Sequence, residues 1–249
     1  MNKRQQDILT LLKEKQYVET KELSKHFFIS ESSIRRDLAF LENESKLERV
    51  KGGAIELGTK RGESRFLTRE KENSTEKDYI VELAMNYIQN GQSLFLDSSS
   101  TVYRLAKRLH RFKQLKVLTN GNLTSYTLGL TNGIEVYTLG GKIVEGECSI
   151  VGVMACEQIK NFSADICFVS SRGISLNGGT DKAEEESQIK KHFYDNSKKN
   201  ILLLDSSKVA KNYFYLSVPF EKIDVVISEQ PLPKQLKEVL EKNNVEIVY

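Results

Sequence analysis

Five short apolar runs between residues 93 and 204 are each followed by side chains that could bind a ligand. The residues after these runs are Asp97-Ser98-Ser99-Ser100-Thr101, Thr119-Asn120-Gly121-Asn122, Gly140-Gly141-Lys142, Ser170-Ser171-Arg172-Gly173 and Asp205-Ser206-Ser207-Lys208. Hydroxyls, lysines and unpaired backbone N–H groups at a helix N-terminus are donors that hold phosphate. Each group taken singly is also an ordinary turn or cap sequence. Together they favour a polar pocket for a small phosphorylated or polyhydroxylated ligand.

The apolar runs before these groups alternate with helical patterns. The runs are residues 93–96, 116–118, 135–139, 166–169, 201–204 and 225–227, and the helical patterns cover 81–89, 101–109, 184–198 and 233–243. Such alternation predicts an α/β domain with a mostly parallel sheet, in which ligands bind beyond the carboxyl ends of the strands. The five polar groups are therefore expected at one edge of the sheet.

A second kind of chemistry is indicated near the start of the chain, in a short amphipathic segment. Its inward stripe is formed by Ile34, Leu38 and Leu41. Opposite that stripe and on its flanks lie Ser32, Ser33, Arg35 and Arg36. Such a face suits a DNA major groove: Arg36 could pair with a guanine edge, Arg35 with phosphate, and the serines with either. The alternative is that the arginines only solvate a surface helix and pair with Glu31 or Asp37.

Two further helices are predicted to hold this segment. Helical spacing of apolar residues predicts a helix over 3–15. Thr20 is a suitable N-cap for a second, short helix, and Ser30 caps the third. Ile29 and Ile34 occupy the two positions of a hydrophobic staple around Ser30. Two short helices joined by a tight connection are the helix-turn-helix arrangement.

A basic hairpin is predicted after the third helix. Residues 47–51 and 54–57 flank Gly52-Gly53, a two-residue turn of the kind that closes a hairpin. The hairpin would carry Arg49 and Lys51 to its tip, where they could contact backbone phosphate. Three helices and a hairpin make residues 1–57 a winged helix-turn-helix domain. Residues 58–76 are rich in Lys, Arg, Glu, Thr and Ser, which predicts a solvated, partly helical linker before a domain at 77–249.

Both halves resemble one protein family. Residues 29–38 with Val50-Lys51-Gly52-Gly53-Ala54 resemble the N-terminal signature of the DeoR family of bacterial transcriptional regulators, over about residues 3–57. Residues 77–228 resemble the DeoR sensor domain, which is similar in fold to ribose-5-phosphate isomerase. The family's pocket motifs are matched by Asp97-Ser98-Ser99-Ser100-Thr101, Thr119-Asn120, Gly140-Gly141-Lys142, Glu184-Glu185-Glu186 with Lys190, and Asp205 with Lys208. The resemblance thus implies operator DNA and a sugar-phosphate effector as partners, and adds Glu186 and Lys190 to the pocket.

Three residues depart from the family pattern. Ser99 replaces a glycine, which would narrow the approach to phosphate, and Lys142 replaces an arginine, which removes bidentate geometry. Arg172 stands where the family often has a small residue. Arg172 could therefore add an anion contact, and the effector could differ from those usual in the family.

Composition limits the remaining possibilities. The 249 residues, 39% of them hydrophobic, suit two globular domains, and a net charge of +3 is too small to indicate nucleic-acid binding by itself. The apolar runs are strand-sized and no signal peptide is recognisable, so we expect a cytoplasmic protein without a membrane partner. Cys148, Cys156 and Cys167 lack a ligand spacing to histidine, which predicts buried thiols and no metal or other cofactor.

The favoured function is repression of a carbohydrate-metabolism operon, with release from the operator by a phosphorylated sugar or a sugar-derived metabolite. We expect a homodimer or homotetramer, because two recognition helices then meet two half-sites. One alternative is that the sensor domain acts as a sugar-phosphate isomerase or acyltransferase-like enzyme, with Asp97, Glu186, Lys190 and Lys208 as acid and base groups. An activator or a ligand-independent DNA-binding protein is the third possibility. The sequence identifies neither the effector nor the operator.

Overall fold

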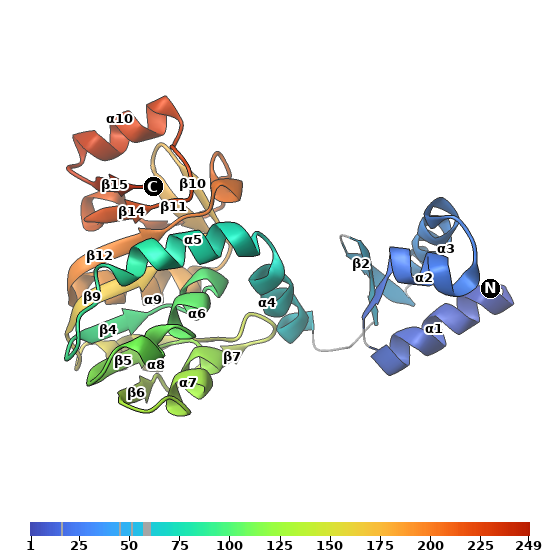
Figure 1. The fold of residues 1–249 in the computed structure, drawn as a ribbon, viewed down its shortest axis with the longest axis horizontal. Helices are drawn as coiled ribbons and strands as arrows, with labels where there is room; N and C mark the ends of the chain where they lie inside the picture. Colours follow the sequence, from blue (N-terminus) through green and yellow to red (C-terminus); the bar gives the residue numbers. More distant parts are fainter. Residues whose placement is uncertain (16, 45, 51, 57–60) are drawn as a thin grey trace. The chain divides into compact units, whose positions relative to one another are not determined.

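The chain forms two units, residues 1–61 and 62–249, each with its own core (Figure 1). The structure is a computed structural model that describes residues 1–15, 17–44, 46–50, 52–56 and 61–249. Among the described residues, no helix combines the length and the hydropathy needed to cross a membrane. The three cysteines, Cys148, Cys156 and Cys167, are all buried.

The first unit is a three-helix domain with a small antiparallel sheet. Its elements are α1 (Lys3–Lys15), β1 (Tyr17–Glu19), α2 (Thr20–Phe27), α3 (Glu31–Asn43), β2 (Leu47–Val50) and β3 (Gly53–Glu56). The strand order is β1-β3-β2, so the hairpin gains a third strand from the segment between α1 and α2. Ile8, Leu23, Ile34 and Leu38 are at most 2% exposed and hold the helices together. This arrangement confirms the predicted winged helix-turn-helix fold.

The turn between α2 and α3 is fixed by local hydrogen bonds. Phe28 ends α2 in the left-handed conformation, with φ of 53°. Ser30 caps α3 as predicted, since its side chain accepts a hydrogen bond from the N–H of Ser33. Thr20, however, is the first residue of α2 rather than its cap, and it is buried. The N–H of Thr20 donates to Gly52 O at 2.7 Å, which ties the start of α2 to the hairpin.

Gly53 is not a turn residue as predicted, because it already belongs to β3. Gly53 already pairs with Val50 in the β2–β3 ladder, and Gly52 has φ of +91°. A Cβ on Gly53 would lie 2.0 Å from Val18 O, so the close approach of β1 requires glycine. Arg49 lies within β2, opposite Ala54, and the predicted contact residue Lys51 lies outside the described residues.

The described part of the segment predicted as a solvated linker is largely helical and, from residue 62 on, belongs to the second unit. It contains α4 (Arg61–Lys71) and the start of α5 (Ser74–Met85). Phe66 is 1% exposed and lies edge-on to Tyr103. Arg104 donates two hydrogen bonds to Glu70 O, at 3.0 and 2.8 Å. Buried Phe66 and the hydrogen bonds of Arg104 near the C-terminus of α4 thus hold this otherwise polar helix in place.

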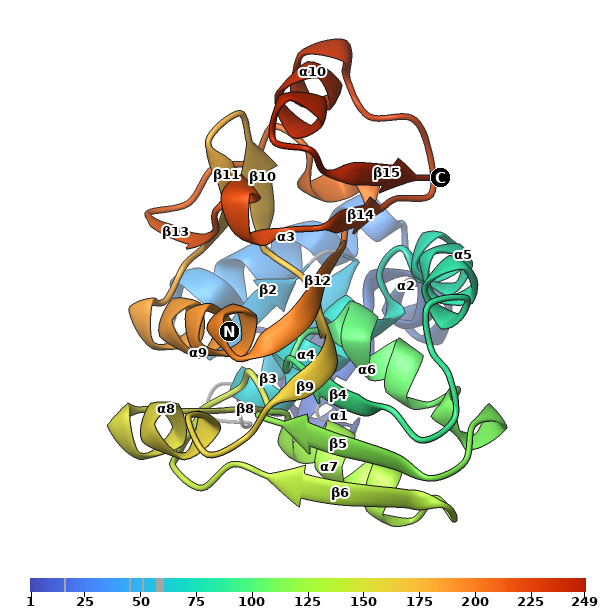
Figure 2. The ribbon, with the colours of Figure 1, turned by 90° about the vertical axis from the view of Figure 1, so that its left-hand side faces the viewer.

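The second unit is built on a parallel seven-stranded sheet, which confirms the α/β prediction. Figure 2 shows the strands stacked in the order β15-β14-β12-β9-β4-β5-β6. Their bounds are β4 (Ser93–Leu96), β5 (Leu115–Thr119), β6 (Ile134–Thr138), β9 (Ala164–Val169), β12 (Ser197–Leu203), β14 (Val225–Ile227) and β15 (Glu246–Val248). Shorter antiparallel strands flank this sheet: β7 (Lys142–Val144), β8 (Ser149–Val151), β10 (Gly173–Ser175), β11 (Gly178–Asp181) and β13 (Tyr215–Val218).

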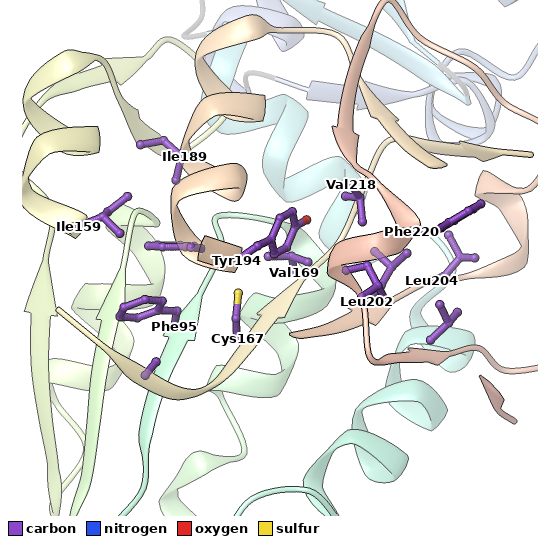
Figure 3. Packing of buried hydrophobic residues seen from close by; sticks show 14 of the residues in the cluster. Phe95, Ile159, Cys167, Val169, Ile189, Tyr194, Leu202, Leu204, Val218 and Phe220 are labelled. Atoms are coloured by element: carbon purple, nitrogen blue, oxygen red, sulfur yellow. The ribbon is translucent and has the colours of Figure 1, made fainter. Parts of the chain in front are cut away.

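Helices cover both faces of the sheet. Besides α4 and α5, the helices of the second unit are α6 (Ser100–Ala106), η1 (Leu109–Arg111), α7 (Asn122–Gly129), α8 (Val153–Ile159), α9 (Glu184–Asp195), η2 (Ser206–Lys208), η3 (Phe220–Lys222) and α10 (Lys234–Lys242). One core joins α5, α6 and α7 to one face of the sheet. The other joins α8, α9 and α10 to the opposite face, and Figure 3 shows Ile159, Ile189 and Phe95 within it. Both faces of the sheet are buried because the strand side chains that point to one face and those that point to the other are mostly apolar.

Candidate ligand pocket and nucleic-acid interface

A cavity of about 220 Å³ lies at the carboxyl ends of the central strands of the second unit. Residues that follow β4, β5, β9 and β12 line it, together with residues from α4, α5, β11 and α9. The wall contains Arg69, Glu72, Asn73, Lys77, Asp97, Ser98, Ser99, Ser100, Asn120, Ser170, Ser171, Arg172, Asp181, Lys182, Glu186, Lys190, Asp205, Ser207, Lys208, Lys211 and Tyr213. Its location agrees with the rule that parallel sheets bind ligands beyond the carboxyl ends of their strands.

Lys77 joins the pocket to the end of α4. Its Nζ donates to Arg69 O, to Glu72 O at 2.8 Å and to Ser100 Oγ at 3.2 Å. Burial, with a further contribution from the nearby Lys208, lowers the pKa of Lys77 to about 8. An anion beside Lys77 would favour its charged form.

Lys208 and Asp205 form an ion pair in the wall. Lys208 Nζ donates to Ser170 Oγ at 2.6 Å and lies 3.2 Å from Asp205 Oδ2. Although burial acts in the opposite direction, Lys208 holds the pKa of Asp205 below its usual value. Asn73 Nδ2 donates to Asp205 Oδ1 at 3.3 Å, so α5 also contacts this pair.

The loop after β4 is held by Asp97, which is 2% exposed. Its two carboxylate oxygens accept hydrogen bonds from Ser99 N at 2.9 Å and Ser170 N at 3.0 Å. Ser99 caps α6 by accepting from Val102 N. Asp97 therefore positions the serine loop between two strands, and burial raises its own pKa.

Lys190 lies at the floor of the pocket between two aspartates. Its Nζ forms an ion pair with Asp181 and lies 3.9 Å from Asp97 Oδ2. Although burial acts in the opposite direction, these carboxylates raise the pKa of Lys190, so its ammonium group stays charged at neutral pH. Glu186, one turn earlier on α9, accepts from Ser149 Oγ at 3.1 Å, and burial raises its pKa.

Three buried polar atoms in the wall have no hydrogen-bond partner among the described residues: Asn120 Oδ1, Ser171 Oγ and Asp205 Oδ2, of which the last lies 3.2 Å from Lys208 Nζ in an ion pair. Asn120 is oriented by its amide, which donates to Ser98 Oγ at 3.3 Å and Ile150 O at 3.2 Å. Because unsatisfied buried polar atoms cost free energy, ligand hydroxyl groups here would stabilise the pocket.

Six residues predicted for the pocket are not among its lining residues: Thr101, Thr119, Gly140, Gly141, Lys142 and Gly173. The two threonines are fully buried under the loops. Gly141 lies so close to β8 that a Cβ would stand 2.6 Å from Val151 O. Lys142 is exposed and forms an ion pair with Glu185 at 2.8 Å. The end of β6 is separated from the pocket because β6 is the outermost strand of the sheet.

Several lining residues were absent from the sequence prediction. Arg69, Glu72 and Asn73 come from the segment that its composition predicted to be a solvated linker, and Lys77 is the first residue after it. Asp181, Lys182, Lys211 and Tyr213 come from short loops and strands. A buried lysine in a charged segment carries no local signal. The Asp181 side chain could have been suspected from the Asp-Lys pair that precedes α9.

In the first unit, the carboxylates of α3 have separate partners. Buried Asp37 accepts from Arg4 Nε at 2.7 Å and Gln5 Nε2 at 3.0 Å, which joins α1 to α3. Glu31 pairs with Arg35 at 2.8 Å, one turn along the helix. Arg36 is exposed and has no acidic partner among the described residues. The guanidinium of Arg36 is thus available to a DNA groove. The contact of Arg35 with Glu31 agrees with the alternative that Arg35 forms a surface ion pair.

The other predicted contact residues of this unit lie around α3 and the hairpin. Ser32 and Ser33 are within 3.0 Å of Ser30 Oγ through their hydroxyls, at the exposed start of α3. Arg49 donates from its backbone N–H to Glu42 Oε1 at 3.0 Å. A shallow depression is lined by Thr20, Glu31, Arg35, Arg49, Gly52 and Gly53, among others.

Known proteins resemble the whole chain. A family model described as "DeoR-like helix-turn-helix domain" matches residues 4–59, and one described as "DeoR C terminal sensor domain" matches 72–230. The chain is 32% identical to the transcriptional regulator GolR of Listeria innocua serovar 6a, over 94% of this chain and 92% of that protein. It is 31% identical to the transcriptional repressor GlcR of Bacillus subtilis (strain 168), over 97% and 93%.

A glycerol-3-phosphate regulon repressor of Escherichia coli (strain K12) is 27% identical over 98% of this chain and 97% of that protein. Among solved structures, a ribose 5-phosphate isomerase from Plasmodium falciparum matches with a TM-score of 0.41 and 19% identity, over 56% of this chain and 54% of that one. Both domain models match in the order that the fold requires, and the relatives cover nearly all of both chains. This chain therefore belongs to the DeoR family of helix-turn-helix transcriptional regulators.

Proposed function

We propose that the protein represses a carbohydrate-related operon and that a phosphorylated sugar metabolite, bound in the pocket of the second unit, releases it from its operator. The observation that carries this proposal is the convergence of Lys77, Lys190 and Lys208 with the serine loop 98–100 around one cavity. Ammonium groups and hydroxyls are suitable partners for a phosphate group. The relatives named as a glycerol-3-phosphate regulon repressor and as the repressor GlcR are consistent with it.

Each part of the ligand has a proposed place. The phosphate binds Lys77, Lys208 and the hydroxyls of Ser98–Ser100, because those groups face the cavity between α5 and the start of α6. Ligand hydroxyls bind Asn120 Oδ1 and Ser171 Oγ, which have no partner among the described residues. Lys190 and its aspartates form the polar floor beneath the sugar.

The signal leaves the pocket through α4. Lys77 Nζ donates to Arg69 O near the end of α4, to Glu72 O just after α4 and to Ser100 Oγ at the start of α6. A phosphate that recruits Lys77 therefore competes with the two carbonyls. In the sequence, α4 directly follows the residues that connect the two units. Ligand binding would therefore shift the position of α4.

DNA recognition is assigned to the exposed face of α3. Arg36 reads a base edge, Arg35 and the serines hold phosphates, and the hairpin residues Arg49 and Lys51 contact the adjacent backbone. A protein with this unit binds operators as an oligomer of two or four copies, so that two α3 helices meet two half-sites.

The test couples ligand binding to DNA release. Sugar phosphates and their unphosphorylated sugars are screened by thermal shift, and each is then added to the full chain bound to a duplex selected from a random library. At least one phosphorylated compound should raise the melting temperature and weaken duplex binding tenfold or more, while its free sugar does neither. Lys208→Met should abolish the response, and Lys198→Met, an exposed lysine paired with Asp165, should keep it. No response to any sugar phosphate contradicts the proposal.

An isomerase is the second candidate, because Asp97, Glu186, Lys190 and Lys208 all line the one cavity. Burial raises the pKa of Glu186, which suits a general acid or base. Turnover of ribose 5-phosphate by the full chain, measured by NMR over hours, separates the two functions. The repressor proposal expects no conversion above the uncatalysed rate.

A further inference from the structure

Two arginines in the pocket wall share one carboxylate oxygen. Arg69 Nη1 lies 2.8 Å from Glu147 Oε2, and Arg172 Nη2 donates to the same oxygen. The side chains of Arg69, Arg172 and Glu147 are 23%, 21% and 16% exposed. Both arginines line the cavity, and Glu147 is not among the lining residues. One carboxylate against two guanidinium groups leaves one formal positive charge beside the cavity.

Two further carboxyl groups lie near Arg172, and each has another partner. Glu186 accepts a hydrogen bond from Ser149 Oγ, and Asp181 forms an ion pair with Lys190. Burial lowers the pKa of Arg69, and the neighbouring Arg172 lowers it further, as expected where like charges are crowded. A guanidinium carries five N–H donors, of which the shared Glu147 oxygen takes one from each arginine. The remaining N–H groups can donate hydrogen bonds to a second planar anion.

We propose that Arg69 and Arg172 bind a carboxylate of the ligand. The effector is then a phosphorylated sugar acid and not the phosphate of a sugar that lacks a carboxylate. A planar carboxylate matches the two parallel N–H donors of a guanidinium. Its one negative charge balances the one positive charge that remains on the two arginines after Glu147 is counted. The phosphate lies at the other wall, with Lys77 and Lys208. This inference rests on the proposed function of the pocket and names the ligand class.

The test uses pairs of compounds that differ at C1, where the aldehyde carbon of the sugar, mostly closed into a ring, is replaced by a carboxylate. The affinity of the full chain is measured by calorimetry for glucose 6-phosphate against 6-phosphogluconate, and for ribose 5-phosphate against 5-phosphoribonate. In at least one pair, the acid should bind ten times more tightly or better. Arg172→Gln should reduce that ratio to below threefold. Arg111→Gln removes the same charge from an exposed arginine of η1, paired with Glu82, and should preserve the ratio.

A second variant keeps the inference testable if Arg172→Gln does not fold. Glu147→Gln removes the shared carboxylate and should increase the preference for the acid at least threefold. Equal affinities within both pairs, or a ratio that Arg172→Gln leaves intact, overturn this inference alone. If none of the four compounds binds and inorganic phosphate does not bind either, the proposed function and this inference fail together.

Discussion

The cationic side chains of the DNA-binding unit and those of the sensor pocket are placed in opposite ways. On α3, the side chain of Arg35 is 64% exposed and has one acidic neighbour on its own helix, and Arg36 is exposed without an acid among the described residues. In the pocket, Lys190 is 9% exposed between two aspartates, and Lys208 is 15% exposed against Asp205. DNA approaches an open surface, whereas a pocket must hold its charges in place before a ligand arrives.

Because of this difference in exposure, substitutions of cations in the two units should affect different quantities, DNA affinity in the first and stability in the second. An exposed cation is solvated in the unbound protein, so its removal changes DNA affinity and little else. A buried cation neutralises buried carboxylates, so its removal also costs stability. Substitutions in the two units should therefore have different signatures.

The largest effect is expected for Lys190→Met. It leaves Asp97 and Asp181 buried without their counter-charge, which should destabilise the second unit by about 3–5 kcal/mol. The matched change Lys15→Met removes one partner of an exposed pair with Glu22 and should cost less than about 1 kcal/mol. Hydrogen exchange read by mass spectrometry assigns each loss of protection to its unit. Equal losses for the two variants would show that burial does not set the difference.

Arg36→Ala should have the next largest effect, on DNA alone. If Arg36 reads a base edge, the variant loses about 1–3 kcal/mol of operator affinity and its preference at one base pair. The melting temperature should stay within the error of measurement, because no described acid depends on Arg36. Affinities for operators varied at each position, measured by fluorescence anisotropy, provide the check. An unchanged preference at every position contradicts base reading.

Lys77 should make ligand binding depend on pH. Its pKa of about 8 lies below the unfolded value of 10.5, so the folded protein disfavours the charged form, and stability should rise as pH increases from about 8 to 10.5. An anionic ligand favours the charged form, so its affinity should fall by up to about tenfold per pH unit above pH 8. Calorimetry between pH 7 and 9.5 tests this. Lys77→Arg, which does not titrate there, should remove the slope, and a wild type without a slope contradicts the assignment.

Much of the second fold could be predicted because the central strands are buried on both faces. The runs around Leu94, Phe168 and Leu202 are apolar along their whole length, and that signal is local. The helix α7 is short and rich in Thr and Ser, and β10, β11 and β13 are held by pairing with one another. Their stability comes from tertiary contacts that no short window of sequence contains.

The pocket was predictable where it follows those strands and not where distant segments complete it. Asp97, Asn120, Arg172 and Asp205 lie at strand ends and reach the cavity. Arg69 and Lys77 belong to a charged segment, and their burial depends on partners such as Glu147 and Ser100 far along the chain. Gly140 and Gly141 after β6 are predicted ligand contacts that do not line the cavity, and Gly141 approaches the backbone of β8. Close backbone approach has the same sequence signature whether the neighbour is a ligand or a strand.

The smallest effect should come from Arg35→Ala, and it tests whether exposed pairs on α3 serve DNA or the fold. The pair with Glu31 spans one helical turn in solvent, so its loss should cost about 0.3–0.5 kcal/mol of stability. If Arg35 also binds phosphate, duplex affinity should fall by one factor for all sequences, and the slope of log affinity against log salt should flatten by about 1. A sequence-dependent loss would instead assign base reading to Arg35, and an unchanged salt slope would leave it as a surface ion pair. Glu31→Gln frees Arg35 and also removes a negative charge that repels phosphate, so that variant should bind every duplex slightly more tightly.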